Sequence, residues 1–269
     1  MSSIRESPVT STISSRQRLT LSRWPGGSNL TSDKVPSEIA YSEPDNVAGA
    51  EDWSFISAFD TSSLQAALPD SASSKDDDLI LRWGFQLQSD EPRLRCVKLF
   101  LDPRQKMPAF VTRGEIQELL IACGKDAVSV VADYLEQLYK HTQEELSKRY
   151  GEVFMRTTAI EWILTVPAIW SDAAKDATLT AAQRAGMGPE IKLISEPEAA
   201  AVYTLQAIQP NHLKTGDSFV VVDAGGGTVD LISYEIRQTR PLRIEESAEG
   251  SGGCCGSAIL NAKDRKSVV

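Results

Sequence analysis

Basic residues are scarce relative to acidic ones in this chain of 269 residues, with 28 lysines and arginines against 37 aspartates and glutamates. The resulting net charge of -9 leaves no basic stripe to neutralise a phosphate backbone, which excludes a nucleic-acid binder. The same charge does not exclude a single nucleotide, because a local nest of backbone amides and a metal ion are enough to hold one.

Long apolar runs and cysteine patterns are also missing. No segment approaches the roughly 20 apolar residues of a membrane span, and the Ser- and Thr-rich N-terminal region lacks the apolar stretch of a secretory signal. Cys96, Cys123, Cys254 and Cys255 have no disulfide or zinc spacing, which predicts a reducing compartment. We therefore expect a cytoplasmic protein without a membrane partner. Cys254 and Cys255 are expected to be two small buried residues beside glycines. The alternative is that they form a redox pair.

What the chain does contain is typical of a globular protein. Hydrophobic residues make up 41% of it and charged residues 24%. A chain of this length buries roughly 70–75% of its unfolded surface on folding, in one large domain or in two lobes.

The N-terminal part of the chain combines short strands with polar segments. Residues 1–17 are expected to form a disordered tail, and residues 61–78 a polar surface insertion. Alternating or apolar runs predict strands at Arg18–Trp24, 35–41 and Ile80–Leu87.

Two helices are predicted next. Thr112 is expected to cap a helix that runs through Cys123, with Glu115 completing a capping box. Apolar residues at helical spacing predict a second helix from Asp126 to Arg149, about 36 Å long. His141 is expected on the polar C-terminal half of that helix, where a positive charge suits the helix dipole.

Strands and helices alternate in the second half of the chain. We expect one helix after a Ser171 cap, at 173–185, and another at 198–207. Strands are expected at Ile160–Val166, Ile191–Ile194, Phe219–Val222 and Val229–Ile236. This order predicts an α/β fold with a mixed sheet.

Three consecutive glycines lie between the last two predicted strands, in Asp223-Ala224-Gly225-Gly226-Gly227-Thr228-Val229-Asp230. Glycines cost backbone entropy, so the run predicts a requirement for positive φ or for close approach to the backbone. Amides pointing at phosphate oxygens, a hydroxyl donor from Thr228 and an aspartate that holds magnesium through water would fit the pattern. A plain hairpin turn is the alternative, and the spacing alone does not decide between the two.

Three segments, in order along the chain, resemble the nucleotide-binding domain of the 70-kDa heat-shock protein (chaperone) family, in the actin and sugar-kinase superfamily. Leu164–Asp172 resembles the family's Thr-Val-Pro-Ala strand and the helix start after it, and Ile194–Ala201 its Glu-Pro-X-Ala-Ala-Ala segment. Val220–Asp230 resembles its second phosphate-binding loop. The variants Trp162 and Ile169-Trp170 look similar to a divergent branch that lacks the peptide-binding domain.

The resemblance implies an actin-like ATPase (ribonuclease H-like) fold, mostly lobe I with the first hairpin of lobe II. Residues 18–110 would be an outer subdomain of lobe I and residues 111–215 its inner α/β subdomain. Residues 216–269 would form part of lobe II and carry the phosphate loop. Gly252-Gly253 resembles the glycine pair that opens the next helix of that lobe.

ATP or ADP with Mg²⁺ is the ligand that the resemblance implies, and client proteins or co-chaperones are the implied partners. The loop residues that would contact the β- and γ-phosphates are Gly225, Gly226, Gly227 and Thr228.

Charged residues would supply the remaining roles. Asp223 and Asp230 would position magnesium-bound and attacking waters. Glu196 would touch the water shell of the metal, and its alternative is a capping carboxylate at a helix start. Lys98 would reach the γ-phosphate, with an ordinary surface lysine as the alternative.

The family's first phosphate loop, Asp-X-Gly-Thr-Thr, has no counterpart in residues 1–17, and its adenosine-binding segment would lie beyond Asn261. Loss of one preorganised donor already costs about 10²–10³-fold in rate, so we expect an incomplete or inactive ATPase and leave enzymatic activity open. A non-enzymatic interaction module that keeps the fold is the alternative, and a small-molecule kinase of the same superfamily is less favoured. The strand around Val221 is expected to expose an unpaired edge and to lower solubility.

Overall fold

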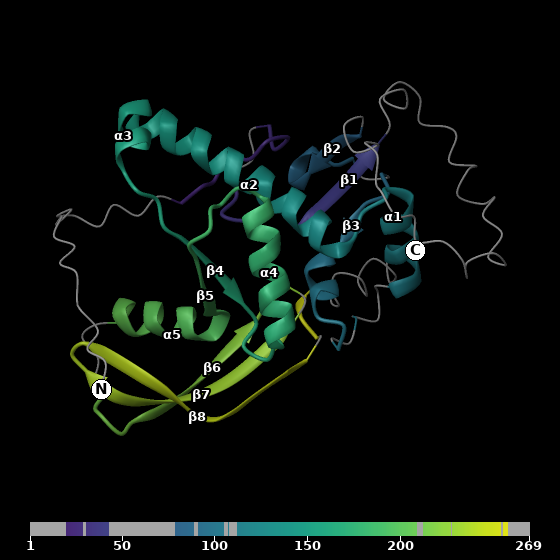
Figure 1. Cartoon of the computed structure of the whole chain (residues 1–269). Coiled ribbons are helices and arrows are strands. Elements are labelled where there is room, and N and C mark those ends of the chain that lie inside the picture. The colour runs from purple at the N-terminus through teal and green to yellow at the C-terminus, as the bar shows by residue number, and fades with distance from the viewer. Residues whose placement is uncertain are drawn as a thin grey trace.

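The computed structural model describes most of the chain. The residues described are 20–28, 31–42, 79–88, 91–104, 107, 112–208, 212–226, 228–253 and 255–257. The expected tail at residues 1–17 and the polar insertion at 61–78 lie outside them. Within the described residues the chain forms a mixed α/β structure with three separate sheets (Figure 1).

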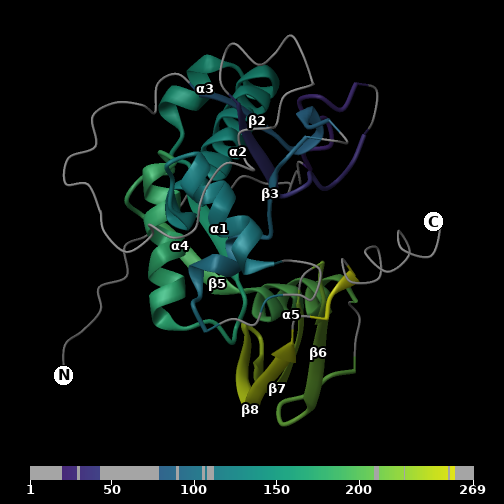
Figure 2. The same ribbon diagram turned by 90° about the vertical axis from the view of Figure 1, so that its right-hand side faces the viewer.

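The N-terminal sheet is antiparallel, in the order β2-β1-β3. Its strands are β1 (Glu38–Ser42), β2 (Ile80–Trp83) and β3 (Leu94–Arg95), with the short 3₁₀ helices η5 (Gly84–Gln86) and η6 (Val97–Leu101) after β2 and β3. The core beneath the sheet includes Ile39, Trp83 and Leu94, which are at most 3% exposed. This sheet and the helices that follow it lie at one end of the molecule (Figure 2).

Two of the predicted strands in this region differ from the structure. The strand expected at Ile80–Leu87 stops at Trp83, because Gly84 has a left-handed φ of +58° and turns the chain into η5. The strand expected at Arg18–Trp24 is absent from the described residues 20–24, where Arg23 makes only an isolated bridge to Thr31. The Trp24 indole N–H donates to the Ser32 carbonyl at 2.7 Å, which folds this segment into a loop.

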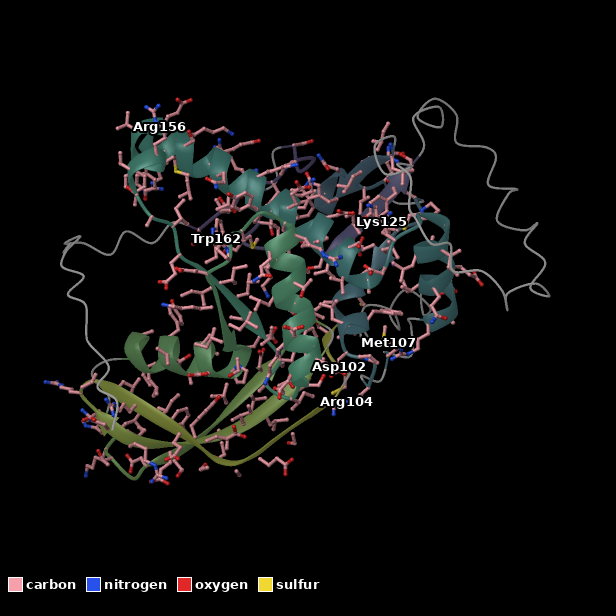
Figure 3. The ribbon with its side chains drawn as sticks, viewed as in Figure 1. Asp102, Arg104, Met107, Lys125, Arg156 and Trp162 are labelled. Atoms are coloured by element: carbon pink, nitrogen blue, oxygen red, sulfur yellow. The ribbon has the colours of Figure 1, made fainter. Side chains whose placement is uncertain are left out.

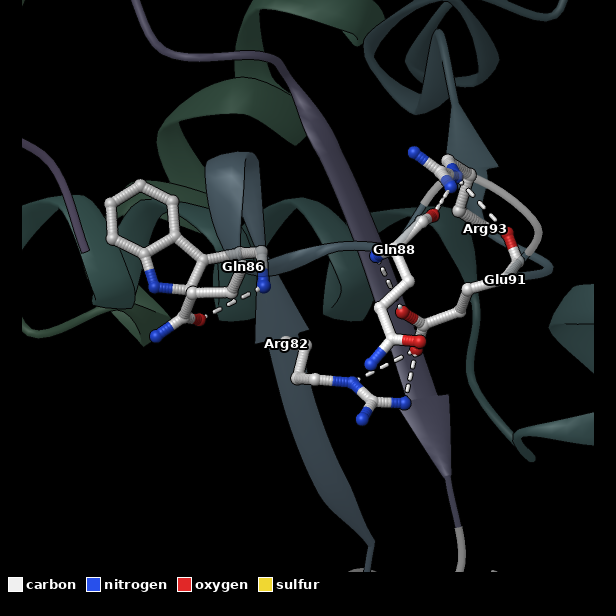
Figure 4. A network of polar contacts seen from close by, with 6 residues as sticks. Arg82, Gln86, Gln88, Glu91 and Arg93 are labelled. Atoms are coloured by element: carbon white, nitrogen blue, oxygen red, sulfur yellow. Dashed lines mark hydrogen bonds and ion pairs between the residues drawn. The ribbon is translucent and has the colours of Figure 1, made fainter. Parts of the chain in front are cut away.

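A polar network closes the connection between β2 and β3 (Figure 4). Glu91 accepts from the Arg82 side chain at 2.9 Å and from the Gln88 amide at 3.2 Å. Arg93 donates to the Glu91 carbonyl at 3.0 Å and pairs with Glu38 of β1 at 3.1 Å. These bonds hold β3, and therefore the start of η6, against β1.

Three helices follow: α1 (Arg113–Ala122), α2 (Ala127–Tyr150) and α3 (Glu152–Thr157). The first two confirm the predicted helices to within one residue at each end, whereas α3 was not predicted. Thr112 stands at the N-cap of α1 but accepts no capping bond through its side chain, so the expected capping box is wrong. Gly151, with φ +83°, separates α2 from α3.

His141 is buried, and its expected place on a polar face of α2 is wrong. Its side chain is 8% exposed, and its Nε2 lies 2.8 Å from the Arg23 carbonyl oxygen. The imidazole packs 5.2 Å from the Trp24 ring and 6.5 Å from the Trp83 ring, measured between centroids. At His141 the C-terminal half of α2 is therefore covered by the N-terminal loop, a contact that the sequence of the helix does not reveal.

Asp126 caps α2 by accepting a hydrogen bond from the Ser129 amide at 2.7 Å. Burial acts to raise the pKa of Asp126, but the bonds from Ser129 and Val128 and the charge of Arg184 together hold that pKa below its ordinary value. A carboxyl whose pKa is lower in the folded state stabilises the fold above the unfolded pKa, and this contribution is lost as the pH falls.

Asp126→Ala should therefore lower the free energy of unfolding by about 1 kcal/mol at neutral pH. The difference should shrink below the ordinary aspartate pKa of about 4, in chemical denaturation measured across pH. Asp176→Ala, at an exposed position of α4 (Asp172–Arg184), is the matched control and should have little effect. Equal losses in the two variants would contradict the capping role.

The middle of the chain forms a parallel pair of strands, β4 (Trp162–Val166) and β5 (Ile191–Ser195), joined through α4. Ser171 caps α4 and accepts from the Ala174 amide at 3.2 Å, as predicted. Ala174, Ala181 and Ala182 are fully buried, and these small side chains let α4 pack closely along α2.

The C-terminal sheet is antiparallel, in the order β6-β7-β8, and the helix α5 (Glu196–Ala207) lies along one of its faces (Figure 1). Ala201 of α5 packs with Ile232 and Tyr234 of the sheet. The strands are β6 (Ser218–Ala224), β7 (Val229–Thr239) and β8 (Leu242–Gly253). Parallel and antiparallel strands occupy separate sheets among the described residues, so the expected single mixed sheet is wrong.

Strand β6 is an edge strand of this sheet within the described residues. Val220 and Val222 are each 60% exposed on it. The expected unpaired apolar edge is therefore present in the described part of the chain.

Ser195 joins three of these elements. It is the last residue of β5 and the N-cap of α5, where its hydroxyl accepts from the Glu198 amide at 3.3 Å. Burial raises the pKa of Tyr234 on β7, and a hydrogen bond between the Tyr234 and Ser195 hydroxyls offsets part of that rise. The start of α5 is thus fixed to the C-terminal sheet.

Candidate functional site

Lys98 and Glu196 are brought together from segments 98 residues apart in the sequence. Lys98 projects from η6, and Glu196 is the first residue of α5. The Lys98 Nζ donates to the Glu196 Oε1 at 2.5 Å and lies 5.3 Å from the centroid of the Trp170 ring. The Lys98 ammonium therefore pairs with a carboxylate and lies over an aromatic ring, unlike a surface lysine that only water surrounds.

The local fold of η6 explains the position of Lys98. Val97, Leu99 and Leu101 are buried, which turns the intervening Lys98 side chain outward. Asp102, 3% exposed, ends η6 and accepts from the Arg104 amide at 3.1 Å.

Asp102 also ties η6 to the start of α4. It accepts a long hydrogen bond of 3.5 Å from the Ser171 amide, and it lies with Arg104 near α4 (Figure 3). The neighbouring Trp170 is 3% exposed, and its Nε1 has no hydrogen-bond partner within the described residues.

Asp223 and Asp230 face each other across the β6–β7 ladder, where their Cα atoms are paired. Asp230 is 1% exposed, and its Oδ1 has no hydrogen-bond partner in the described part of the chain. Burial raises the pKa of Asp230, and the negative charges of Glu196 and Asp223 raise that pKa further. A hydrogen bond from the Thr228 side chain and the positive charge of Lys98 offset part of the rise.

The charged cluster singled out in the sequence consists of two pairs, Lys98 with Glu196 and Asp223 with Asp230. Asp230 is influenced by the charges of Lys98, Glu196 and Asp223, which come from η6, α5 and β6. Three carboxyl groups against one ammonium leave an excess of negative charge, which favours a cation at this position.

The fold accounts for only part of the glycine content of the turn between β6 and β7. The Gly225 N–H donates to the Thr228 carbonyl at 2.9 Å, so this amide is used inside the turn. Neither Gly225 nor Gly226 has a positive φ, and no atom of the described residues lies within 4 Å of a Cβ built on Gly226. Glycine at 226 therefore leaves space beside the backbone in the described structure, while Gly227 lies outside the described residues.

The sequence reasoning missed the contribution of β8 to this site. Gly252-Gly253 was expected to open a helix, but both residues belong to β8, where Gly252 pairs with Asp230 and Gly253 with Val229. Cys255 is exposed, so its expected burial is wrong, and Cys254 lies outside the described residues.

The carboxyl groups beside the glycine turn could hold a hydrated magnesium ion. Among the described residues, no three histidine, cysteine, aspartate or glutamate side chains lie close enough to hold a metal together. Mg²⁺ usually keeps several waters and binds through one or two carboxylates plus substrate phosphates. The unpartnered Asp230 Oδ1, with Asp223 and Glu196 nearby, fits that mode of binding.

The fold and the site together define a mixed α/β domain with a glycine turn beside a cluster of three carboxylates and a lysine. The model of the protein family described as Hsp70 protein matches residues 123–239, which include β4, α5 and the glycine turn. The chain thus contains an Hsp70 family domain over these residues.

Curated relatives agree with this assignment. The chain is 35% identical to a chaperone protein HscA homolog of Acinetobacter baumannii over 127 residues, which are 47% of this chain and 17% of that protein. It is 28% identical to heat shock 70 kDa protein 12A of Homo sapiens over 197 residues, covering 52% of this chain and 29% of that protein. The matches thus span less than a third of the length of either relative. In the described residues, no helix is both long and apolar enough to cross a membrane.

Proposed function

We propose that this site binds the phosphates of ATP or ADP together with Mg²⁺, in a chaperone-like ATPase domain of the 70-kDa heat-shock family. The observation that carries the proposal is the convergence of Lys98, Glu196, Asp223 and Asp230 beside the glycine turn. These residues come from four elements, η6, α5, β6 and β7. The Hsp70 family match, which covers all of them except Lys98, supports the nucleotide as the ligand that they serve.

The chemistry of the cluster fits a metal–phosphate ligand. Lys98 offers an ammonium to a phosphate oxygen, and its present partner Glu196 would turn to the water shell of the metal. Asp223 and Asp230 would hold metal-bound waters, and Gly226 would admit phosphate oxygens close to the backbone. Bound Mg²⁺ supplies charge neutralisation at the phosphates, which is the main requirement of phosphoryl transfer.

If the chain has the proposed function, we expect it to be divided into the two lobes of this ATPase fold. Residues 18–110 and 111–215 would belong to lobe I, and residues 216–269 to lobe II. Because a relative is named as a chaperone, client proteins or co-chaperones are the partners that we propose.

Titration of the protein with a fluorescent ATP analogue in Mg²⁺ tests the proposal, and we expect saturable binding that unlabelled ATP and ADP displace. ATP hydrolysis is measured in parallel, with Asp223→Asn as the background control. Binding without hydrolysis would favour the non-enzymatic module, and transfer of phosphate to a small molecule would favour a kinase. No displaceable binding would contradict the nucleotide assignment.

Gly226→Ala should weaken binding of the ATP analogue about tenfold, which is about 1.4 kcal/mol. The added methyl group would lie more than 4 Å from every atom of the described residues, so we expect a ligand that approaches the turn to be the group that it contacts. The free energy of unfolding should stay close to that of the wild type, as measured by chemical denaturation.

Gly114→Ala is the matched control for this substitution. Gly114 lies in α1, and the nearest atom to a Cβ built there is 3.9 Å away. We expect a slightly more stable helix and unchanged affinity. Wild-type affinity in Gly226→Ala would show that no ligand contacts the turn.

A further inference from the structure

Asp230 lies between two strands at the site, with Asp223 on β6 on one side and Gly252 on β8 on the other. A Cβ built on Gly252 would be 2.7 Å from the Asp230 Oδ1 and 2.8 Å from the Val229 carbonyl oxygen. Real side chains do not approach oxygen atoms so closely, so any residue other than glycine would push the Asp230 carboxyl group away. Glycine at 252 lets that buried, unpartnered carboxyl group stay where it is.

After β8 the chain returns across the glycine turn. The Cys255 amide donates to the Gly253 carbonyl at 2.9 Å, directly after the end of β8. The Ser257 N–H then donates to the Gly225 carbonyl at 3.0 Å. This last bond attaches the segment after β8 to the turn proposed to bind phosphate.

Gly256 is buried directly against that turn. A Cβ built on it would be 2.6 Å from the Gly225 carbonyl oxygen and nearer still to the Gly226 carbonyl oxygen. Gly252 and Gly256 do not have positive φ, so space rather than backbone conformation requires glycine at both positions.

We infer that Gly252 and Gly256 are positioning residues of the site, which hold the Asp230 carboxyl group and the Gly225-Gly226 turn in the arrangement that takes a magnesium-bound phosphate. This inference rests on the proposed function. Gly252 approaches the Asp230 Oδ1 and the Val229 carbonyl oxygen at the start of β7, and Gly256 approaches the carbonyl oxygens of Gly225 and Gly226. Gly252 positions the carboxyl group proposed to hold the cation, and Gly256 positions the turn proposed to bind the phosphate.

Gly252→Ala and Gly256→Ala test the inference, with Gly250→Ala as the matched control on the same strand. A Cβ on Gly250 would have the Ile232 side chain as its nearest neighbour, at 3.1 Å, and would lie 3.6 Å from the Leu231 carbonyl oxygen, so it approaches no atom of Asp230 or of the glycine turn that closely. Affinity for the fluorescent ATP analogue is measured with Mg²⁺ and with a chelator. Amide hydrogen exchange is measured in parallel over residues 219–231.

Each glycine has its own expected signature. Gly252→Ala should weaken binding about tenfold in Mg²⁺ and much less in the chelator, because it displaces a group proposed to hold the cation. Gly256→Ala should weaken binding about tenfold in both conditions. Both variants should speed exchange at the turn, and Gly250→Ala should resemble the wild type. A loss of thermal stability alone would not produce this dependence on Mg²⁺.

Wild-type affinity and wild-type exchange in Gly252→Ala and Gly256→Ala would overturn the inference. If the wild-type protein binds no nucleotide, the proposed function fails, and hydrogen exchange at the turn still decides whether the two glycines position it. If Gly256→Ala does not fold, Ser257→Pro takes its place. It removes the donor to Gly225 at the first described helical residue, where proline is tolerated, and unchanged exchange at the turn would then overturn the role of that segment.

Discussion

Asp230→Asn should stabilise the protein at neutral pH and, at the same time, weaken its affinity for Mg²⁺-ATP about 10- to 100-fold. The carboxyl group of Asp230 is buried, its Oδ1 has no partner in the described residues, and two further carboxylates lie near it. Removing its charge relieves that repulsion and desolvation, but it also removes a group proposed to hold the cation.

The sign of the stability change follows from the pKa of Asp230. Burial and the charges of Glu196 and Asp223 raise that pKa in the folded protein, so between the unfolded and folded pKa values the folded state binds more protons than the unfolded one. The contribution of Asp230 to the free energy of unfolding therefore falls as the pH rises through this window. The asparagine variant should gain about 1 kcal/mol at neutral pH, and the gain should disappear below about pH 4, where the carboxyl group is protonated in both states.

Chemical denaturation across pH, together with titration of the ATP analogue, measures both effects. Asp126→Asn provides the contrast, because the pKa of Asp126 is lowered and its charge stabilises α2. That variant should lose stability at neutral pH and keep wild-type affinity. An Asp230→Asn protein that is less stable than the wild type at neutral pH would contradict the assignment of an uncompensated buried charge.

Lys98→Met should also weaken Mg²⁺-ATP binding about 10- to 100-fold, since a hydrogen bond to a charged group contributes about 1.5–3 kcal/mol. Methionine keeps an apolar stem against Trp170 but removes the ammonium that pairs with Glu196. The substitution should raise the pKa of Asp230 further, because Lys98 opposes the rise in the wild type. Binding of the ATP analogue and NMR titration of Asp230 measure the two effects.

Lys140→Met is the matched control for Lys98→Met. Lys140 is exposed on α2, and its Nζ pairs with Glu136 one helical turn away at 3.0 Å. Lys140→Met therefore removes a lysine–glutamate ion pair without touching the site. Exposed pairs of this kind contribute about 0.3–0.5 kcal/mol. Wild-type affinity is expected, and an equal loss in both lysine variants would mean that Lys98 acts only through net charge.

The helices α1, α2, α4 and α5 and the strands β4 and β5 were predictable because their signals are local. Asp126 and Ser171 accept capping bonds from amides three residues ahead, so the starts of α2 and α4 can be predicted from the sequence. The burial of His141 was not predictable, because it depends on a loop 118 residues away in the chain. Strand β8 was missed because its exposed stretch, with Glu245, Glu246 and Glu249, lacks the alternation of a half-buried strand.

The candidate site was predictable in its residues rather than in its geometry. Resemblance to a known family pointed to Lys98, Glu196, Asp223 and Asp230, and the structure pairs Lys98 with Glu196 and Asp223 with Asp230. Which amide of the glycine turn is already used, and which glycine has open space, depends on three-dimensional packing. Gly256 is the clearest case, because the atoms that require glycine there belong to a turn about thirty residues earlier in the sequence.

Ser195 ends a strand and begins a helix, and its side chain opposes the rise in the pKa of Tyr234 on a different sheet. A rotation of the C-terminal sheet against the β4–β5 pair would therefore change the surroundings of Ser195. Because Glu196 is the next residue in the chain, such a rotation would reach the carboxylate that pairs with Lys98 one peptide unit later. The position of that carboxylate thus depends on the junction between the two sheets.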